Sequence, residues 1–369
     1  MKYQEPRRVL VFCLSGLGDA ILASPALAAL HARPKQFQLT LLAMFPSVAE
    51  YLRDLQITDD VRLIQFLHMP KWKILRNVWP LRQDRFDVSV IPYAMNRLGY
   101  NFMSRVIGAD ERIGFRYQRQ RRVNLPELSN VVFSEDPTLH VVEENLRWAA
   151  YLAREDVHTL PDEMLFRSSP ESVRDAEEFL TAHGLEQAAP LIGIHPSCNA
   201  LKNQQNRCWP PQHFVQFIER MAVQVPSARF LLFEGPADAR LAGMIRQNAA
   251  SVTVARMLPV RVVGALIRQC QLFVSNDSGL LHIASACKVP SVAIFGPTNP
   301  TWVSPWKVPH IIVTRGLPCS PCFKYSSRPL SCPAGLDYAC VQALPLESVE
   351  AAALQLLQSS PASSVIPPA

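Results

Sequence analysis

A carboxylate at a predicted helix start is the first residue in this sequence that could do chemistry. The apolar run at residues 9–14 ends in residues 15–18 (SGLG), and Asp19 follows where a helical stretch over residues 20–30 begins. The positive end of a helix dipole stabilises the ionised form of such a carboxylate. An ionised carboxylate can act as a general base, although Asp is also a common helix cap. Asp19 is therefore a candidate base, with helix capping and half of a dinucleotide fingerprint as the alternatives.

A second cluster combines a helix start with polar side chains. Residues 272–275 predict a buried strand, residues 277–279 (DSG) follow it, and His282 lies about one helical turn further on. Backbone amides at a helix start attract phosphate, and Asp277 is suited to cap that helix. Residues 296–298 (GPT) end the next predicted strand at the same edge of the sheet. Two converging loops predict a diphosphate site, with a satisfied structural histidine as the alternative for His282.

Charged residues also follow two further predicted strands. Lys202 and Arg207 come after the strand at 191–195, and either could reach a phosphate or remain a solvated surface charge. Asp238 comes after the strand at 229–233, at another predicted helix start. Both loops are expected at the same edge of the sheet as the candidate diphosphate site.

Together these segments resemble glycosyltransferase family 9, the ADP-heptose:lipopolysaccharide heptosyltransferases. The resemblance covers most of the chain and rests on GLGDAILASPAL, on SNDSGLLHIASACKVPSVAIFGPTNP, and on HPS and RCWP between them. It implies a GT-B fold, which is an α/β architecture with two Rossmann-like parallel-sheet domains facing a cleft. It also implies inverting, metal-independent transfer of heptose from an ADP-heptose donor to the lipopolysaccharide inner core. Such an enzyme is cytoplasmic and works at the inner-membrane surface.

The resemblance assigns roles to individual residues. Asp19 matches the proposed catalytic base, which would deprotonate the acceptor hydroxyl. Arg207 stands where the family usually has a phosphate-binding lysine, with Lys202 as a rival, and Gly16 stands where many members carry a basic residue. Arg207, His282 and the helix start would then stabilise the departing ADP. The remaining matches, to the donor-binding loop and to an acidic donor contact, are Asp277, Ser278, Gly279 and Asp238.

Four clustered cysteines form a separate candidate. Cys319, Cys322, Cys332 and Cys340 begin with a C-x-x-C pair, and four thiolates could bind structural Zn or Fe tetrahedrally. The second pair is more widely spaced than in compact zinc ribbons. The resemblance adds that related protein heptosyltransferases use a Cys-ligated iron. A structural metal, reduced thiols and disulfides remain the alternatives, and no cofactor is expected to be required for catalysis.

Two basic segments are candidates for contacts outside the donor site. Residues 105–122 concentrate arginines opposed only by Asp110 and Glu111, which suits the phosphate and carboxylate groups of an anionic acceptor. Residues 69–82 mix lysine and arginine with Trp72 and Trp79, a pattern typical of a membrane interface. A solvated surface is the alternative for each segment. The candidate acceptor-binding residues are Arg112, Arg116, Arg119, Arg121 and Arg122.

The elements that position these residues alternate along the chain. Short β-branched runs are separated by longer amphipathic stretches, which favours a parallel α/β architecture. Strands are expected at 9–14, 38–43, 88–92, 191–195, 229–233, 272–275 and 291–295. The strand signal lapses around one predicted helix at 171–183. We therefore expect an acceptor-binding domain at 1–170, a linker and helix at 171–189, a nucleotide-sugar-binding domain at 190–358, and a disordered tail at 359–369.

Composition sets the remaining limits. With 369 residues, 49% hydrophobic and 18% charged, the chain is globular and long enough for two domains. A net charge of +6 is too diffuse to predict a nucleic-acid binder, and no apolar run is long enough for a transmembrane helix. Nine cysteines, an odd number in a long chain, favour a reducing compartment. With only 14 glycines, those that cluster near the candidate sites are expected to serve positions that require them.

Two other functions remain open. The chain could be a transferase of the same family that acts on a protein or another acceptor. It could also be a nucleotide-sugar-binding protein without turnover, a reading that Arg207 in place of lysine permits. A dehydrogenase is disfavoured because neither glycine turn carries the third glycine of a dinucleotide fingerprint.

Overall fold

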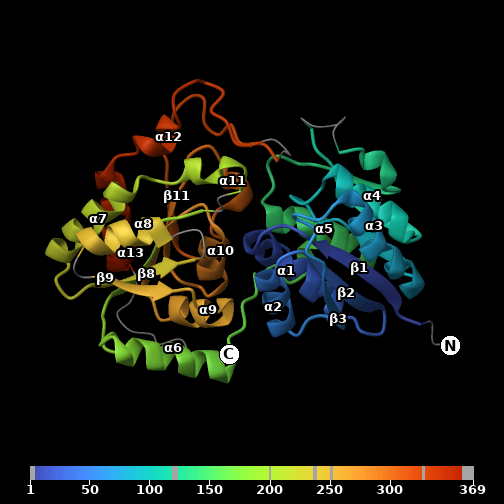
Figure 1. The fold of residues 1–369 in the computed structure, drawn as a ribbon, viewed down its shortest axis with the longest axis horizontal. Helices are drawn as coiled ribbons and strands as arrows, with labels where there is room; N and C mark the ends of the chain where they lie inside the picture. Colours follow the sequence, from blue (N-terminus) through green and yellow to red (C-terminus); the bar gives the residue numbers. More distant parts are fainter. Residues whose placement is uncertain are drawn as a thin grey trace. The chain divides into compact units, whose positions relative to one another are not determined.

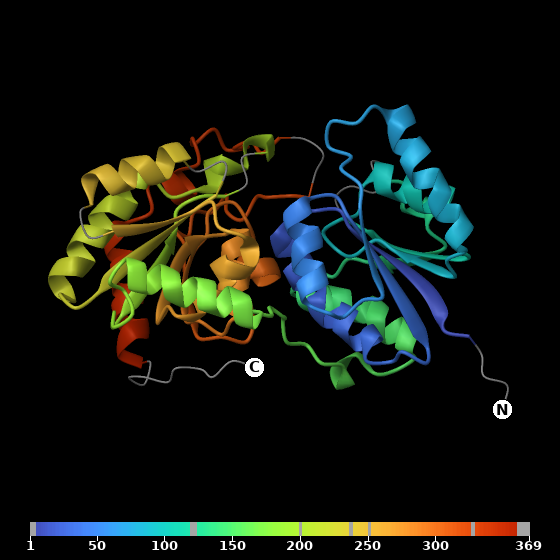
Figure 2. The same ribbon diagram turned by 60° about the horizontal axis from the view of Figure 1, so that its bottom comes forward.

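The computed structural model describes residues 5–118, 124–198, 201–235, 239–249, 252–325 and 329–359. Its contacts divide the chain into two compact units, Met1–Leu165 and Phe166–Ala369. Each unit contains a six-stranded parallel sheet with helices on both sides (Figure 1; Figure 2). The α/β fold expected from the sequence, with two Rossmann-like parallel sheets, is confirmed.

The first sheet has the strand order β3-β2-β1-β4-β5-β6. Its central strand β1 pairs in parallel with β2 on one side and β4 on the other. Residues 9–13 of β1 are fully buried because helices cover both faces of the sheet, which explains the continuous apolar run. The strands are β1 (Arg7–Cys13), β2 (Phe37–Ala43), β3 (Asp60–Leu63), β4 (Val88–Val90), β5 (Glu111–Arg116) and β6 (Val131–Ser134).

The helices of the first unit connect successive strands of this sheet. Helix α1 follows β1 and packs against α5, so the two segments join the beginning and the end of the unit. The α-helices are α1 (Leu17–His31), α2 (Pro46–Asp54), α3 (Lys71–Val78), α4 (Leu98–Ile107) and α5 (Val141–Ala153). The short 3-10 helices are η1 (Trp79–Asp84), η2 (Pro126–Leu128) and η3 (Val157–Thr159).

The second sheet repeats this plan with the order β12-β11-β10-β7-β8-β9. Its strands are β7 (Leu191–His195), β8 (Arg229–Glu234), β9 (Val252–Arg256), β10 (Leu272–Asn276), β11 (Ser291–Ile294) and β12 (His310–Val313). Its helices are α6 (Pro170–Ala182), η4 (Leu201–Arg207), α7 (Pro211–Gln224), α8 (Ala239–Asn248), α9 (Val260–Arg268), α10 (Gly279–Ala286), α11 (Pro300–Val303), α12 (Ala339–Gln342) and α13 (Leu346–Ser359). Helix α6, expected between the domains, packs against α9 in this second unit.

The strand orders fix where each unit can hold a ligand. In the first sheet the chain proceeds outward from β1 through β2 and β3, and then outward on the other side from β4. In the second sheet it proceeds outward from β7 and then, in the opposite direction, from β10. Ligands of open parallel sheets bind where the loops after two such neighbouring strands diverge. The two positions are therefore the carboxyl ends of β1 and β4, and of β7 and β10.

Five strands of the structure were not predicted from the sequence. Four of them, β3, β6, β9 and β12, lie at the edges of the sheets, where half-exposed residues do not form a continuous apolar run. The fifth, β5, is interior but carries the arginines that the sequence assigned to acceptor binding. In the tail, Ser359 belongs to α13, and residues 360–369 lie outside the described residues. None of the helices that the structure describes is long and apolar enough to cross a membrane.

Two helical glycines offer a matched test of packing in the second unit. A Cβ at Gly264 in α9 would clash with the buried ring of Phe166, whereas a Cβ at Gly243 in α8 would meet nothing within 4 Å. Gly264→Ala should therefore lower the free energy of unfolding by roughly 1–3 kcal/mol, because the ring and the helix must shift. Gly243→Ala should leave it unchanged or raise it by up to about 1 kcal/mol, because alanine favours helix. Urea unfolding of both variants measures this, and equal effects would contradict the packing.

Candidate functional site

The three loops expected to form an anion site in the second unit converge on one ion pair. Arg207, the last residue of η4, donates from its Nη1 to Asp277 Oδ2 at 2.7 Å and to Thr298 Oγ1 at 3.4 Å. The Arg207 and Asp277 side chains are only 15% and 7% exposed. The ring of Phe323 lies 5.9 Å from the guanidinium carbon. This ion pair and its neighbours hold together the segments after β7, β10 and β11, beside the place where the strand order changes direction between β7 and β10.

The charges at this site are set by burial and by each other. Burial lowers the pKa of Arg207, but the Asp277 carboxylate and two neighbouring thiols raise it further than burial lowers it. For His282, burial lowers the pKa and the Arg207 cation lowers it further, while Asp277 opposes them, and the resulting value is about 4. At neutral pH the site therefore holds a cationic arginine, a carboxylate and a neutral imidazole.

Among the described residues, two polar atoms of this site are buried and have no hydrogen-bond partner. They are Nε of Arg207 and Nδ1 of His282, and both side chains lie close enough to Asp277 to interact with its charge. Buried polar atoms are nearly always paired in native proteins, because an unpaired group costs about 1–3 kcal/mol. The site is therefore built to accept a further polar group.

The residue that caps α10 differs from the expected one. Ser278 is the N-cap, and its Oγ accepts from the Leu281 amide at 3.4 Å. The same hydroxyl contacts His195 Nδ1 at 2.9 Å and Ser275 Oγ at 3.0 Å, which ties β7, β10 and α10 together. The prediction that Asp277 caps this helix is therefore wrong, because its carboxylate is drawn to the Arg207 cation instead. Gly279 is the first residue of α10, where backbone amides have no intrahelical partner.

Asn276 is a part of this site that the sequence reasoning missed. Its Nδ2 donates to the Pro196 carbonyl at 2.7 Å, and its Oδ1 accepts from the Trp209 amide at 2.8 Å. This buried amide fixes the two ends of the segment that carries Arg207. The signal was its position at the end of β10, beside Asp277. Two expected donor contacts cannot be placed, because Asp238 and the Lys202 side chain lie outside the described residues.

The first unit places Asp19 in the first turn of α1, as expected. The N-cap is Gly16, which makes no side-chain cap bond, so Asp19 is not the cap of this helix. The electrostatic effects on two buried tyrosines show which charged groups lie near Asp19. Burial raises the pKa of Tyr100 and of Tyr117, while Arg97 lowers both values and Asp19 raises both. Asp19 and Arg97 therefore lie close to the same two rings.

Arg97 is a candidate that the sequence reasoning missed. It precedes α4 in the loop after β4, and its guanidinium carbon lies 5.8 Å from the centre of the Tyr100 ring. Because β4 is the neighbour of β1, the loop that carries Arg97 emerges beside the loop that leads to Asp19. The one feature of the sequence that could have identified Arg97 is its position in the loop after the predicted strand at 88–92. Arg97 supplies a cation near Asp19, although Gly16 carries none.

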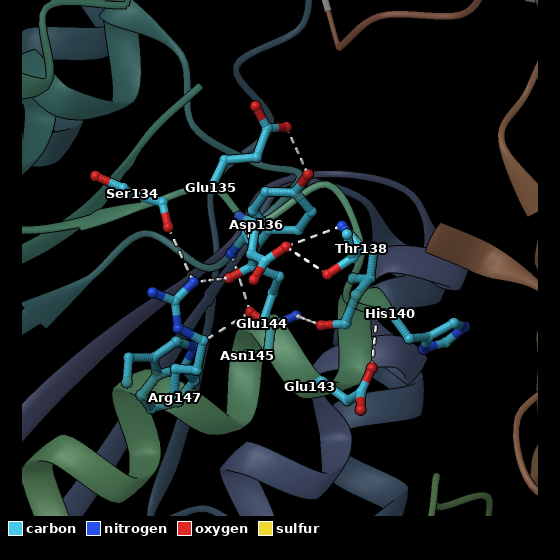
Figure 3. A network of polar contacts seen from close by, with 12 residues as sticks. Ser134, Glu135, Asp136, Thr138, His140, Glu143, Glu144, Asn145 and Arg147 are labelled. Carbon is cyan, nitrogen blue, oxygen red and sulfur yellow. Dashed lines mark hydrogen bonds and ion pairs between the residues drawn. The ribbon is translucent and has the colours of Figure 1, made fainter. Parts of the chain in front are cut away.

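A partly buried polar network fixes the loops at this edge of the first sheet. Glu135 accepts from the Tyr93 hydroxyl and from the Gln118 amide, each at 2.7 Å. Figure 3 shows Glu135 beside the turn that begins α5, where the Glu144 carboxylate accepts from the Asp136 amide at 2.6 Å and pairs with Arg147. Burial raises the pKa of Glu144, and the Asp136 amide and Arg147 oppose this. The network connects the loops after β4, β5 and β6 to one helix.

The start of α5 is fixed in the same network. His140 is its N-cap and accepts from the Val142 amide at 3.2 Å, while Glu143 accepts from the His140 amide at 2.8 Å (Figure 3). This reciprocal capping satisfies amides that the helix itself leaves without partners. It fixes α5, against which α1 with its Asp19 packs.

The arginine cluster is only partly described, and the described members have partners. Arg112 donates to the Ala109 carbonyl at 2.8 Å and to the Leu128 carbonyl at 3.1 Å, and Arg116 lies 3.7 Å from Glu127. These two guanidinium groups hold the loops around β5. The other three candidate acceptor-binding residues, Arg119, Arg121 and Arg122, lie outside the described residues.

The four clustered cysteines line one cavity of about 40 Å³ in the second unit. All four are free thiols, and the backbone amide of Tyr338, followed by those of Leu336, Ala334 and Gly335, lowers the pKa of Cys332. In the described part of the chain, no group of three or more His, Cys, Asp or Glu side chains is placed to hold a metal ion. The thiols would therefore have to rearrange to bind one. The segment also reaches the ion pair, because the amides of Cys322 and Phe323 donate to the Pro297 carbonyl at 2.9 and 2.8 Å.

Comparison with known proteins gives matches across both units. Lipopolysaccharide heptosyltransferase 1 of Pseudomonas aeruginosa is 26% identical over 86% of this chain and 86% of its own length. The structure of ADP-heptose lipopolysaccharide heptosyltransferase II of Escherichia coli has a TM-score of 0.70 at 19% identity, with 95% of this chain and 98% of that chain covered. The iron-containing dodecameric glycosyltransferase TibC of enterotoxigenic E. coli has a TM-score of 0.55 at 14% identity, covering 97% of this chain and 78% of that one.

The family match includes most of the site in the second unit. The sequence model of glycosyltransferase family 9 (heptosyltransferase) matches residues 78–331, which contain Arg97, Arg207, Asp277 and His282. Asp19 precedes the matched residues, so its role depends on the geometry around α1. A match over more than half of the sequence is decisive for membership: the chain belongs to glycosyltransferase family 9, and it is a glycosyltransferase.

Proposed function

We propose that this enzyme transfers heptose from ADP-heptose to the lipopolysaccharide inner core with inversion at the anomeric carbon, and that the chemical step needs no metal. The observation that carries the proposal is a pair of buried side-chain nitrogens, Arg207 Nε and His282 Nδ1, that have no hydrogen-bond partner among the described residues and belong to the site at the start of α10. Positive charge and helix amides suit a diphosphate. The names of the relatives supply the sugar and the acceptor class.

In the proposed donor site, Arg207 binds the diphosphate and Asp277 orients Arg207. The carboxylate accepts from Nη1, and we assign Nε, which has no partner among the described residues, to the ligand. His282 is neutral, so it contributes a hydrogen bond instead of a full charge. Ser278 and Gly279 contribute the amides of the helix start, because the Ser278 hydroxyl is used as the cap. Lys202 and Asp238 remain predicted donor contacts.

In the proposed chemical step, Asp19 removes the proton from the acceptor hydroxyl. The acceptor oxygen then forms a bond to the anomeric carbon, while the bond from that carbon to the ADP oxygen breaks and ADP leaves with the electron pair. Arg207 and the α10 amides stabilise the charge that develops on the diphosphate. Arg97 lies close to the same two tyrosines as Asp19 and offers a cation to an anionic acceptor.

The proposal divides these roles between the two units. The first unit, with Asp19 and Arg97, binds the acceptor, and the second unit binds the nucleotide sugar. The acceptor-binding prediction for residues 112–122 is retained, with Arg97 added because Arg112 and Arg116 already hold backbone and side-chain partners. A lipopolysaccharide-core acceptor is membrane-anchored, so we place the enzyme in the cytoplasm, peripheral to the inner face of the inner membrane.

Asp19→Asn tests the catalytic base. The change should lower kcat by about 10²- to 10⁴-fold, because asparagine cannot accept the proton. Affinity for ADP, measured by calorimetry, should remain within twofold because the carboxylate is not in the donor site.

Arg207→Ala tests the donor site. In contrast to Asp19→Asn, it should reduce the affinity for ADP at least tenfold in the same calorimetric measurement.

Glu171→Gln is the matched control for Asp19→Asn. Glu171 also lies in the first turn of a helix, but it is exposed on α6. It should change neither kcat nor ADP affinity. Unchanged turnover in Asp19→Asn would reject Asp19 as the base, and transfer to protein but not to core oligosaccharide would reject the acceptor.

His282 should make the stability of the protein depend on pH. Its pKa is lowered from 6.5 to about 4 by burial, so the unfolded chain binds a proton before the folded chain does. Stability is therefore lost as pH falls from about 6.5 toward 4, by about 2 kcal/mol between pH 7 and pH 5. His282→Gln should remove this loss, as measured by urea unfolding at both pH values. His158→Gln, at an exposed position, should leave it in place.

The cysteine group is proposed as a structural metal site that supports the donor loops. Protein purified without chelator should contain about one Zn or Fe per chain by elemental analysis, because four thiolates suffice for a tetrahedral ion. Cys319→Ser/Cys322→Ser should lose the metal and lower the melting temperature, whereas Cys13→Ser, at a buried position elsewhere, should keep the metal. Metal-free wild-type protein with four titratable thiols in the cluster would instead identify them as reduced cysteines.

A further inference from the structure

Exposed apolar side chains are concentrated in one part of the first unit. Half of the large hydrophobic residues that are exposed in the described part of the chain lie between residues 67 and 102. Trp72, Trp79 and Phe102 are 61%, 57% and 54% exposed. Single exposed apolar residues are ordinary, but a group of large ones marks an interaction surface.

These side chains come from elements that pack against one another. Helix α3, the following η1 and helix α4 are mutually in contact, and α3 and α4 lie side by side in Figure 1. Trp72, Leu75 and Trp79 have the i, i+3, i+7 spacing of one helical stripe. Leu98 and Phe102 are four residues apart on α4, which also places them on one side of their helix. We call Leu67, Trp72, Leu75, Trp79, Leu98 and Phe102 the α3–α4 face.

The α3–α4 face is distinct from the surface that these elements present to the core. The core of this unit already contains Phe66, Val78, Leu81, Met103 and Ile107, all of them buried. The helices are therefore apolar on two sides, one packed and one exposed. An amphipathic helix that only covers a sheet needs the first side and not the second.

The charge around this face is predominantly positive, and the one acidic residue of α3, η1 and α4 is Asp84 at the end of η1, whose carboxylate pairs with Arg62. Residues 61–83 contain no Asp or Glu, and α4 contains none either. Lys71, Lys73 and Arg76 are exposed on α3, and Arg82 is exposed on η1. The Lys73 ammonium lies 5.4 Å from the centre of the Trp72 ring, and the Arg82 guanidinium carbon lies 5.1 Å from the centre of the Trp79 ring. Each tryptophan is thus accompanied by a cation.

We propose that the α3–α4 face docks on an anionic lipid bilayer. Tryptophan and leucine would enter the headgroup region, where amphipathic rings are favoured, and the lysines and arginines would attract acidic headgroups. A surface made only of cations would bind polyanions in general, and a purely apolar one would favour self-association. The combination of exposed tryptophan and exposed lysine-rich charge, with the Asp84 carboxylate already paired with Arg62, matches a membrane surface. The inference deepens the membrane location given under the proposed function by naming the surface that makes the contact, and it does not depend on the sugar that is transferred.

Vesicle sedimentation tests the docking. Wild-type protein should bind vesicles of phosphatidylcholine with phosphatidylglycerol, bind pure phosphatidylcholine vesicles at least tenfold more weakly, and dissociate at high salt. Lys71→Glu/Lys73→Glu should reduce binding to the anionic vesicles by roughly 25-fold or more, because each cation near such a surface contributes about fivefold. Trp72→Ser/Trp79→Ser should reduce it at least tenfold.

Matched controls separate this face from the rest of the surface. Val223→Ser removes a 79% exposed apolar side chain in the second unit, and Lys35→Glu reverses an exposed charge elsewhere in the first unit. Lys35→Glu should reduce binding by no more than about twofold, and Val223→Ser should not change it. All variants should keep the melting temperature of the wild type, since the altered side chains are exposed.

Three results would overturn the proposal. The first is that the wild-type protein does not bind anionic vesicles. The second is that the variants of the α3–α4 face bind these vesicles as well as the control variants do. The third is that analytical ultracentrifugation shows a dimer for the wild type and a monomer for Trp72→Ser/Trp79→Ser. An activity assay adds a test that rests on the proposed function. The face variants should lose transfer to a core acceptor embedded in vesicles and keep transfer to the same acceptor without its acyl chains. Absence of all transfer by the wild type would contradict the proposed function and leave the vesicle result to decide the docking.

Discussion

The parallel course of every strand is the constraint on which the rest of this structure depends. Because parallel strands all end at the same edge of a sheet, every loop that follows a strand emerges at that edge. The order of strands then changes direction between β1 and β4 and between β7 and β10. Asp19 and Arg97 follow the first pair, and Arg207 and Asp277 follow the second. Residues far apart in sequence are brought together because their strands are neighbours.

Within the second unit, the same neighbours leave Arg207 charged and His282 neutral. Burial opposes charge on both Arg207 and His282, but Asp277 pairs directly with the arginine and keeps it cationic. The imidazole gains too little from the same carboxylate and stays neutral, since the adjacent guanidinium repels a second proton. The site thus combines one fixed cation with an uncharged hydrogen-bonding group. Such a limited charge suits the diphosphate that we propose this site binds and later releases.

The sequence predicted the parts of this arrangement that depend on local pattern. The central strands are continuous apolar runs. The predicted ends of β1, β7 and β10 therefore lie within one or two residues of the observed ends. The polar residues after them were recognisable because little else interrupts those runs. Edge strands such as β3 and β12 were missed because exposure dilutes the apolar signal. Arg97 was missed because its importance comes from the pairing of β4 with β1, which no local pattern records.

The sequence by itself thus determined the α/β class, the family and the candidates Asp19, Arg207, Asp277 and His282, because strand periodicity and helix starts are local properties. Only the tertiary structure decided which partner each group has. Asp277 pairs with Arg207 and leaves the helix cap to Ser278, and Arg112 holds two carbonyls instead of facing outward. These choices depend on the distance and burial of groups from different strands. The energies of charge pairing and desolvation are fixed only when the chain has folded.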